Sequence, residues 1–371
     1  MADPADTGTA DFEALLAGMA ERGASDLHLK ADRPPILRLE GEVRFADGPA
    51  LDAHAVARLA EAAMDDRSVA RLRERGQAEF SRSLEDGSRF RVTVYRQRGR
   101  LSVAVRRLSR DIPSFGDLHL PPEAMERLCR ARQGLVIFTG VTGTGKSTSI
   151  AACLDVINAR RRCHIVTVED PIEYLLQDKE AFVDQREIGT DVPSYEAAMQ
   201  SLLRADPDVV LVGEMRSAET VEGVLRAAET TRLVFTTTHA MSAPGAVRRV
   251  LDLFEERPRR LVRETLAACL VGVVCQRLVP AADPNVGRVP ATEVLLATPA
   301  VRSAIRAGET ERLADLASAD AADGMHDLTQ DLARLVREEW IHPADAYEAA
   351  PNPEALKVAI RGVTIRKGTV R

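Results

Sequence analysis

The feature that most constrains this chain is a glycine-rich turn between an apolar run and a helical run. Residues 135–139 are β-branched and aromatic, residues 140–147 follow the pattern G-x-x-x-x-G-K-S, and an alanine- and isoleucine-rich helical pattern starts at Thr148. A strand, a glycine turn and a helix start in this order provide the context that a phosphate-binding loop requires. The alternative is a glycine-rich turn that binds nothing.

The residue types of this loop match the chemistry of a nucleotide site. Backbone N–H groups and the helix N-terminus cradle phosphates, Lys146 reaches the β- and γ-phosphates, and Ser147 offers a hydroxyl to Mg²⁺. Glycine lets the backbone approach where a Cβ would clash. The predicted ligands are therefore ATP and Mg²⁺, and the predicted binding residues are Gly140, Thr142, Gly143, Thr144, Gly145, Lys146, Ser147 and Thr148.

Length and composition narrow the class of protein. A chain of 371 residues predicts two or three domains, and 45% hydrophobic with 29% charged residues is typical of a globular protein. The net charge of −6 argues against a nucleic-acid partner.

No apolar run reaches the ~18 residues of a membrane span and the N-terminus is acidic, so we expect a cytoplasmic protein whose membrane connection comes through a partner. The five cysteines include no C-x-x-C pair, which favours reduced thiols over a zinc ribbon.

The first part of the chain, residues 1–108, has the pattern of a small α+β domain with an antiparallel sheet. Alternating runs predict strands, and helical periodicity predicts two helices. The predicted strands are residues 24–29, 35–39, 78–84, 90–96 and 101–108, and the predicted helices are residues 11–23 and 53–76. Prolines and a glycine in residues 109–133 break regular structure and predict a linker.

The pattern changes in residues 134–371. Unbroken apolar runs at residues 135–139, 164–168, 209–212 and 233–237 alternate with helical segments. This alternation predicts a parallel sheet covered by helices. From Arg248 onward the periodicity reads as helical to the end, with loops at residues 280–290, 320–324 and 351–353.

Acidic residues follow two of these strands. Glu169, Asp170 and Glu173 come after one strand, and Glu214 comes after another in the apolar-strand-then-acid form of a Walker B motif. Because ligands bind at the carboxyl ends of parallel strands, these acids are candidates to position Mg²⁺ through water, Asp170 in particular, and to polarise the attacking water. His239 follows a fourth strand and is a candidate γ-phosphate sensor. Read in isolation, each acid is more often a helix cap or turn residue, and such a histidine is more often structural.

The order of these motifs resembles the secretion-superfamily ATPases that drive type IV pili, and most of all the PilT retraction family. The resemblance covers about residues 10–362 and rests on six motifs plus the N-terminal run at residues 23–29. These motifs are residues 140–147, 167–173, 204–208, 212–216, 227–230 and 236–239. It implies an α/β protein with a PAS-like α+β domain, a linker, and a RecA-like P-loop ATPase domain with a helical C-terminal region, assembled as a hexamer.

The resemblance also implies roles for single residues. Glu169, Asp170 and Glu173 match the Asp box, Glu214 the Walker B glutamate and His239 the His box. Arg91 and Arg106 match arginines that reach the nucleotide of a neighbouring subunit.

The implied function is a motor that powers pilus retraction and twitching through an inner-membrane platform protein. The alternatives are a pilus-extension or type II secretion ATPase, or an accessory retraction paralogue with weak turnover that acts beside a paralogous ATPase.

Three segments depart from the family pattern. Residues 230–232 read Thr-Thr-Arg where the family has Thr-Gly-His, and residues 236–240 read Thr-Thr-Thr-His-Ala where it has Gly-Thr-Leu-His-Thr. The retraction segment at residues 300–307 has lost its final acid. In that segment Val301, Ala304 and Ile305 share one apolar face, beside a basic edge of Arg302 and Arg306. We expect it to couple hydrolysis to movement; the alternative is a core helix with solvated arginines.

Overall fold

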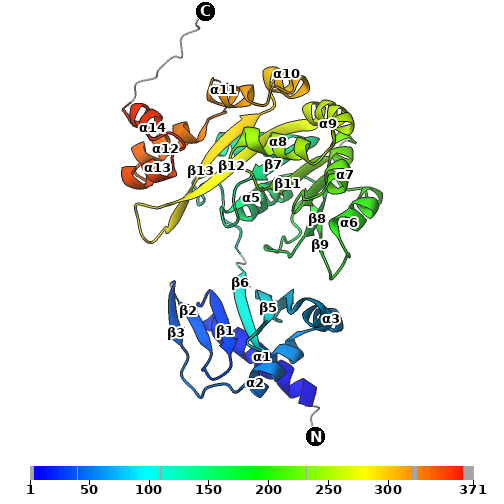
Figure 1. Ribbon diagram of the computed structural model, residues 1–371, viewed down its shortest axis with the longest axis vertical. Coiled ribbons are helices and arrows are strands. Elements are labelled where there is room, and N and C mark those ends of the chain that lie inside the picture. The colour runs from blue at the N-terminus through cyan, green and yellow to red at the C-terminus, as the bar shows by residue number, and fades with distance from the viewer. Residues whose placement is uncertain (1–3, 40, 109–110, 231, 320–323, 362–371) are drawn as a thin grey trace, which may run out of the picture. The chain divides into compact units, whose positions relative to one another are not determined.

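The computed structural model describes residues 4–39, 41–108, 111–230, 232–319 and 324–361 (Figure 1). The chain divides into two compact units. The first comprises Met1–Asp111 with Pro171–Tyr174, and the second comprises Ile112–Asp170 with Leu175–Arg371. Thr231, the central residue of the first departure, lies outside the described residues.

The first unit is built on a six-stranded sheet in the order β3-β2-β1-β6-β5-β4. Every neighbouring pair in it is antiparallel, which confirms the predicted antiparallel sheet. The strands are β1 (Asp26–Lys30), β2 (Ile36–Leu39), β3 (Glu42–Phe45), β4 (Gln77–Ser83), β5 (Arg89–Gln97) and β6 (Arg100–Leu108). Strand β3 has no buried residue, which explains why no hydrophobic alternation predicts it.

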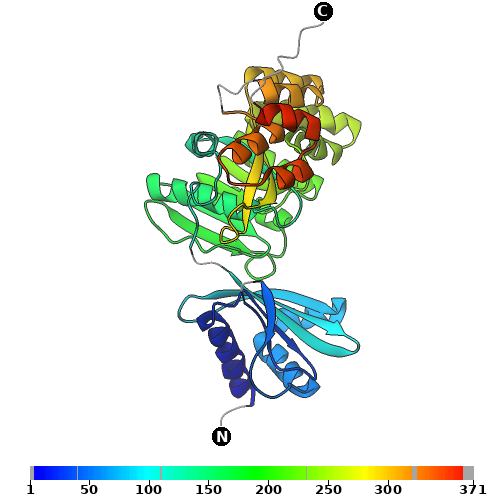
Figure 2. The same cartoon turned by 90° about the vertical axis from the view of Figure 1, so that its left-hand side faces the viewer.

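Three helices bury one face of this sheet: α1 (Pro4–Glu21), α2 (Ala53–Ala63) and α3 (Asp66–Arg75). Figure 2 shows α1 and α2 below the strands. The prediction of one helix over residues 53–76 is wrong, because Met64 is extended and Asp65 caps a new helix through its bond to the Ser68 N–H. Gly76 ends α3 in the left-handed conformation, as a glycine C-cap does.

The second unit holds a seven-stranded sheet in the order β13-β12-β7-β11-β10-β8-β9. All neighbours are parallel except β12 and β13, so the predicted parallel sheet is confirmed. The strands are β7 (Gly134–Thr139), β8 (His164–Glu169), β9 (Phe182–Glu187), β10 (Val209–Val212), β11 (Leu233–Thr238), β12 (Leu270–Pro280) and β13 (Arg288–Leu296).

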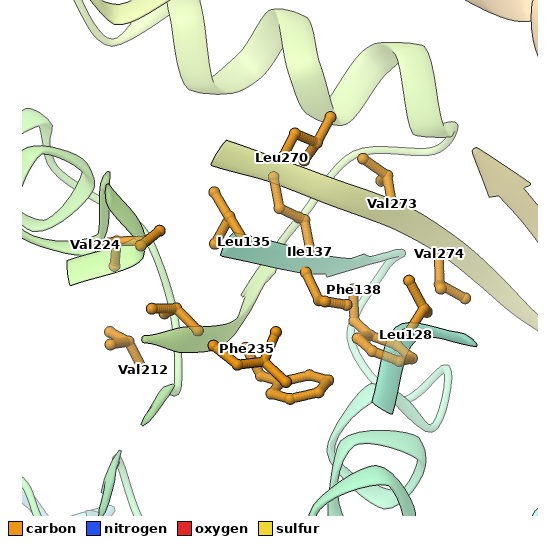
Figure 3. Close-up of a cluster of buried hydrophobic side chains, with 14 of the residues drawn as sticks. Leu128, Leu135, Ile137, Phe138, Val212, Val224, Phe235, Leu270, Val273 and Val274 are labelled. Atoms are coloured by element: carbon orange, nitrogen blue, oxygen red, sulfur yellow. The ribbon is translucent and has the colours of Figure 1, made fainter. Parts of the chain in front are cut away.

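Helices cover this sheet on both faces, so its central strands are buried throughout. Figure 3 shows Leu135, Ile137 and Phe138 of β7 beside Phe235 of β11 and Val274 of β12. Burial on both faces explains why these strands read as unbroken apolar runs. The helical elements before β12 are α4 (Pro122–Arg130), α5 (Lys146–Arg160), α6 (Tyr195–Leu202), η1 (Leu203–Ala205), α7 (Ala218–Glu229), α8 (Ala243–Asp252) and α9 (Glu256–Cys269).

The prediction that the chain is helical from Arg248 to its end is wrong, because β12 and β13 form an antiparallel hairpin that extends the sheet. Strand β12 lies between β7 and β13 and is buried along most of its length, so its apolar residues do not alternate. An unbroken apolar run of this kind cannot be told from a buried helix by periodicity. The later elements are helical: α10 (Pro299–Ala307), α11 (Arg312–Ala319), α12 (Leu328–Arg337), α13 (Pro343–Ala349) and α14 (Pro353–Ile360).

The prediction that residues 109–133 lack regular structure is also wrong in part, because this segment contains α4. Pro121 and Pro122 stand at the N-cap and the first helical position, where proline is favourable because no intrahelical N–H bond is lost. Met125 and Leu128 of this helix are fully buried in the core of the second unit.

Across the described part of the chain, no helix combines the length and the apolar character that crossing a membrane requires.

Candidate active site

The glycine-rich loop joins β7 to α5 and has a positive φ, which favours glycine, at three positions. Gly140, Gly143 and Gly145 have φ angles of 143°, 81° and 83°. A Cβ on Gly140 would lie 2.5 Å from the Gln276 carbonyl oxygen and 2.7 Å from Thr144 Oγ1. A side chain at Gly140 would therefore displace the loop or its support, and side chains at the other two positions would strain the backbone.

Lys146 is the first residue of α5 and is almost fully buried. Its Nζ donates to the carbonyl oxygens of Gly140 (2.8 Å) and Val141 (3.0 Å), and Thr144 Oγ1 also donates to Val141 (3.0 Å). These bonds hold the lysine charge against the loop, at the positive end of the helix. Because Ser147 and Thr148 follow in the first turn, the structure brings the predicted phosphate-binding residues together at one helix N-terminus.

The structure brings Glu214 and His239 together at the carboxyl ends of neighbouring parallel strands. Glu214 Oε1 lies 3.0 Å from His239 Nε2, and its other oxygen accepts a 2.7 Å hydrogen bond from Arg216 Nε. Burial opposes ionisation of Glu214, but the hydrogen bond from Arg216 and the charge of His239 outweigh it and lower its pKa. Glu214 is therefore a fixed carboxylate that can accept a proton or orient a water molecule.

Glu169 ends β8, which pairs with β10. Its Oε1 accepts hydrogen bonds from Thr167 Oγ1 (2.7 Å) and Gln185 Nε2 (3.2 Å), which fix the carboxylate at the sheet edge. Asp170 is exposed directly after it. The third predicted acid, Glu173, is grouped apart from them with the first unit.

Two buried threonines hold the segment that carries His239. Thr139 Oγ1 accepts from the Ala240 N–H (2.8 Å), while Thr237 Oγ1 donates to the Gly213 carbonyl (2.6 Å). Strands β7, β10 and β11 are thereby linked at their carboxyl ends. The sequence reasoning missed both residues, although polar side chains at the ends of buried strands are a signal that could have identified them.

Tyr195 is a third residue that the sequence reasoning missed. It begins α6, and its hydroxyl lies 2.6 Å from where a Cβ on Gly213 would stand, immediately before Glu214. Burial, followed by the charge of Asp170, raises the pKa of Tyr195. Its hydroxyl is thus neutral and close to the carboxylates. A tyrosine at the start of a helix carries no sequence signal for such a place.

A cavity of about 410 Å³ opens beside the loop. Gly140, Val141 and Thr144 line one side of it, the end of β12 another, and Asp345 and Glu348 of α13 complete it. The sequence reasoning could not place this cavity, since it does not predict β12 as a strand.

The candidate metal-binding groups at the loop and at the strand ends are oxygen donors. Among the described residues there is no cluster of three or more histidine, cysteine, aspartate or glutamate side chains that could hold a metal ion by themselves. The hydroxyl of Ser147 and the carboxylates of Glu169, Asp170 and Glu214 are instead hard oxygen donors. This donor set fits Mg²⁺, which keeps several waters and shares its coordination with phosphates.

In the first unit, Arg91 and Arg106 are opposite one another on β5 and β6. Arg91 Nη2 donates to Glu173 Oε1 at 2.8 Å, and Arg106 Nε donates to Asp26 Oδ1 at 2.9 Å. The Arg106 side chain is 65% exposed. Their action on a neighbouring subunit stays a prediction.

Helix α10 contains the predicted coupling segment. Val301, Ala304 and Ile305 are buried, which confirms the predicted apolar face. The description of Arg302 as part of a basic edge is wrong, because its guanidinium is half-buried and donates to the Ala267 and Ala268 carbonyls at the end of α9. Those carbonyls have no intrahelical partner, so the arginine satisfies them.

Known proteins resemble this chain along most of its length. The family described as "Type II/IV secretion system protein" matches residues 9–339. The chain is 37% identical to the type IV pilus retraction ATPase PilT of Pseudomonas aeruginosa, covering 93% of this chain and 99% of that protein. It is 36% identical to the type IV pilus ATPase PilU of the same organism, covering 95% of this chain and 91% of that protein. A crystal structure of the pilus retraction motor PilT with bound ADP superposes with a TM-score of 0.84 at 40% identity, covering 92% of this chain and 98% of that one.

Proposed function

The chain belongs to the type II/IV secretion system protein family. We propose that it is an ATPase that powers type IV pilus retraction. The observation that carries the proposal is the 3.0 Å pair of Glu214 and His239, next to a phosphate-binding loop in the same sheet. An acid held ionised at this edge is the group that ATP hydrolysis requires.

Each residue of the site has a role in this reaction. The loop N–H groups and Lys146 bind the phosphates, while Ser147, with Glu169 and Asp170 through water, would hold Mg²⁺. Mg²⁺ neutralises charge that develops on the phosphates. Glu214 orients the attacking water and accepts its proton. His239 holds Glu214 and responds to the γ-phosphate.

We assign residues 1–108 to a PAS-like domain. We assign residues 134–371, together with α4 of the segment predicted as a linker, to a RecA-like ATPase domain with a helical C-terminal part. The antiparallel sheet covered by helices on one face supports the first assignment. The parallel sheet with its phosphate-binding loop supports the second.

The assembly is proposed by analogy with the family that the sequence motifs resemble. We assign to this chain a homo-hexamer in which Arg91 and Arg106 reach the nucleotide of a neighbouring subunit. Its partner is the inner-membrane platform protein of the pilus, so the protein is cytoplasmic and peripheral at that membrane.

Deleting the encoding gene tests whether the protein powers retraction or extension of the pilus. Abundant surface pili without twitching would support retraction, whereas a loss of pili would identify an extension ATPase. A second candidate is an accessory retraction paralogue, which the almost equal identity to PilT and PilU supports. In that case the purified protein should turn over ATP weakly, and its effect on twitching should depend on the paralogous ATPase.

A further inference from the structure

One residue of β12 contacts both ends of the phosphate-binding loop. Strand β12 runs parallel to β7 (Figure 3), and Cys275 is in register with Thr139, so the next residues on the two strands are Gln276 and Gly140. Gln276 is 2% exposed, and its Oε1 accepts a 3.0 Å hydrogen bond from Ser149 Oγ in the first turns of α5.

Gln276 also lies close to two glycines of the loop. Its carbonyl oxygen lies 2.5 Å from where a Cβ on Gly140 would stand, and its Nε2 lies 3.1 Å from the corresponding point on Gly145. The backbone of Gln276 therefore contacts the start of the loop, while its amide contacts the end of the loop and the beginning of α5. Glycines contribute no side-chain packing of their own, so the loop depends on such outside contacts for its shape.

We propose that Gln276 is a positioning residue for ATP hydrolysis: its buried amide fixes the junction of loop and helix, so that the N–H groups and Lys146 converge on the phosphates. This inference rests on the proposed ATPase function. A buried amide that loses its partners is costly, and small displacements in a reaction site cost large factors in rate.

The first test replaces Gln276 by methionine, which has a similar volume and has no amide oxygen to accept the hydrogen bond from Ser149. We expect kcat/KM for ATP to fall by about tenfold to a hundredfold in a folded protein. The matched control is Asn158→Met, which removes another buried amide from the far end of the same helix, where Nδ2 donates to the Gln177 carbonyl at 2.7 Å. The control should lower Tm at least as much and leave kcat/KM unchanged.

The second test uses the pH dependence of Gln276→Glu. A protonated carboxyl is uncharged like the amide and can accept the hydrogen bond from Ser149, whereas the ionised form places a negative charge beside the loop that binds the phosphates. Burial raises the pKa of such a carboxyl. The activity of Gln276→Glu relative to wild type should therefore recover as pH falls from about 8 to about 6, which a purely structural role would not produce.

If Gln276→Met does not fold, Ser149→Ala removes the partner hydroxyl instead and should lower kcat/KM in the same direction. The proposal is overturned if folded Gln276→Met, or Ser149→Ala in its place, keeps wild-type kcat/KM, or if Asn158→Met loses turnover equally. It is also overturned if the relative activity of Gln276→Glu does not change with pH. Absence of turnover in the wild-type protein would contradict the proposed function itself, and the wild-type assay separates the two failures.

Discussion

Glu293 allows a quantitative prediction about stability. This carboxyl lies on β13, is 7% exposed, and accepts a 3.0 Å hydrogen bond from the Ala243 N–H at the start of α8. Burial raises its pKa from 4.5 to about 7; the Ala243 bond and the Arg277 charge lower it, and Asp327 adds to the increase. Cys275, its neighbour on β12, also faces it. We therefore predict that Glu293→Gln changes how stability depends on pH.

The sign follows from proton binding. The unfolded chain releases this proton near pH 4.5 and the folded chain near pH 7, so between these values the unfolded state binds fewer protons. The free energy of unfolding should thus decrease as pH rises through this window and level off above it. At about 1.4 kcal/mol per pH unit, the full loss is about 3 kcal/mol. Glutamine still accepts the Ala243 hydrogen bond and cannot ionise, so the variant should not show this loss.

The assay is urea unfolding of wild type and Glu293→Gln between pH 5 and pH 8.5, at one protein concentration, followed by circular dichroism. The stability advantage of the variant should grow by about 2–3 kcal/mol across this range. Glu222→Gln, at an exposed position on α7, is the control and should leave the pH dependence unchanged. Parallel curves for wild type and Glu293→Gln would refute the reasoning, since they would mean that burial does not perturb this carboxyl.

Four further predictions concern the motor. Lys146→Ala should abolish ATP turnover while circular dichroism shows a folded protein, because the loop loses its point charge; a folded variant with most of its activity would exclude a phosphate-binding role. Glu214→Gln should bind a fluorescent ATP analogue but turn ATP over at least about a hundredfold more slowly; an active Glu214→Gln with an inactive Glu169→Gln would mean that the two roles are reversed. Arg106→Ala should impair hydrolysis, and mixing it with Glu214→Gln subunits should restore activity at shared interfaces; no recovery in rings shown to contain both would contradict action between subunits. Arg306→Ala, which removes a half-exposed ion pair with Glu264, should preserve turnover and hexamers but abolish twitching; a proportional fall in all three would show a structural role.

The structure revises which arginine can test coupling in α10. Arg302 caps the carbonyl end of α9, so its removal would destabilise the packing of two helices. Arg306 forms only a partly exposed 3.4 Å ion pair, which contributes little to stability. For this reason we test coupling with Arg306→Ala alone, and not with both arginines of the predicted basic edge.

The phosphate-binding loop and the acids that follow the buried strands could be predicted from short stretches of sequence. These features are local: the strand, the turn and the first helical turn lie within about fifteen residues, and the glycine positions follow from backbone sterics alone. The chemistry of Lys146 and Ser147 is likewise set by their spacing from the turn, so their roles could be predicted before any fold was known.

Which distant residues share the site depends on the order of the strands in the folded sheet. Glu214 meets His239 because β10 and β11 are neighbours in the sheet, and Gln276 supports Gly140 because β12 adds to the other edge of β7. Strand order is set by the packing of the whole sheet, and a run buried on both faces has no period that distinguishes strand from helix. That is why the hairpin with Gln276 and Glu293, which contacts both the phosphate-binding loop and the start of α8, could not be predicted from the pattern of its residues.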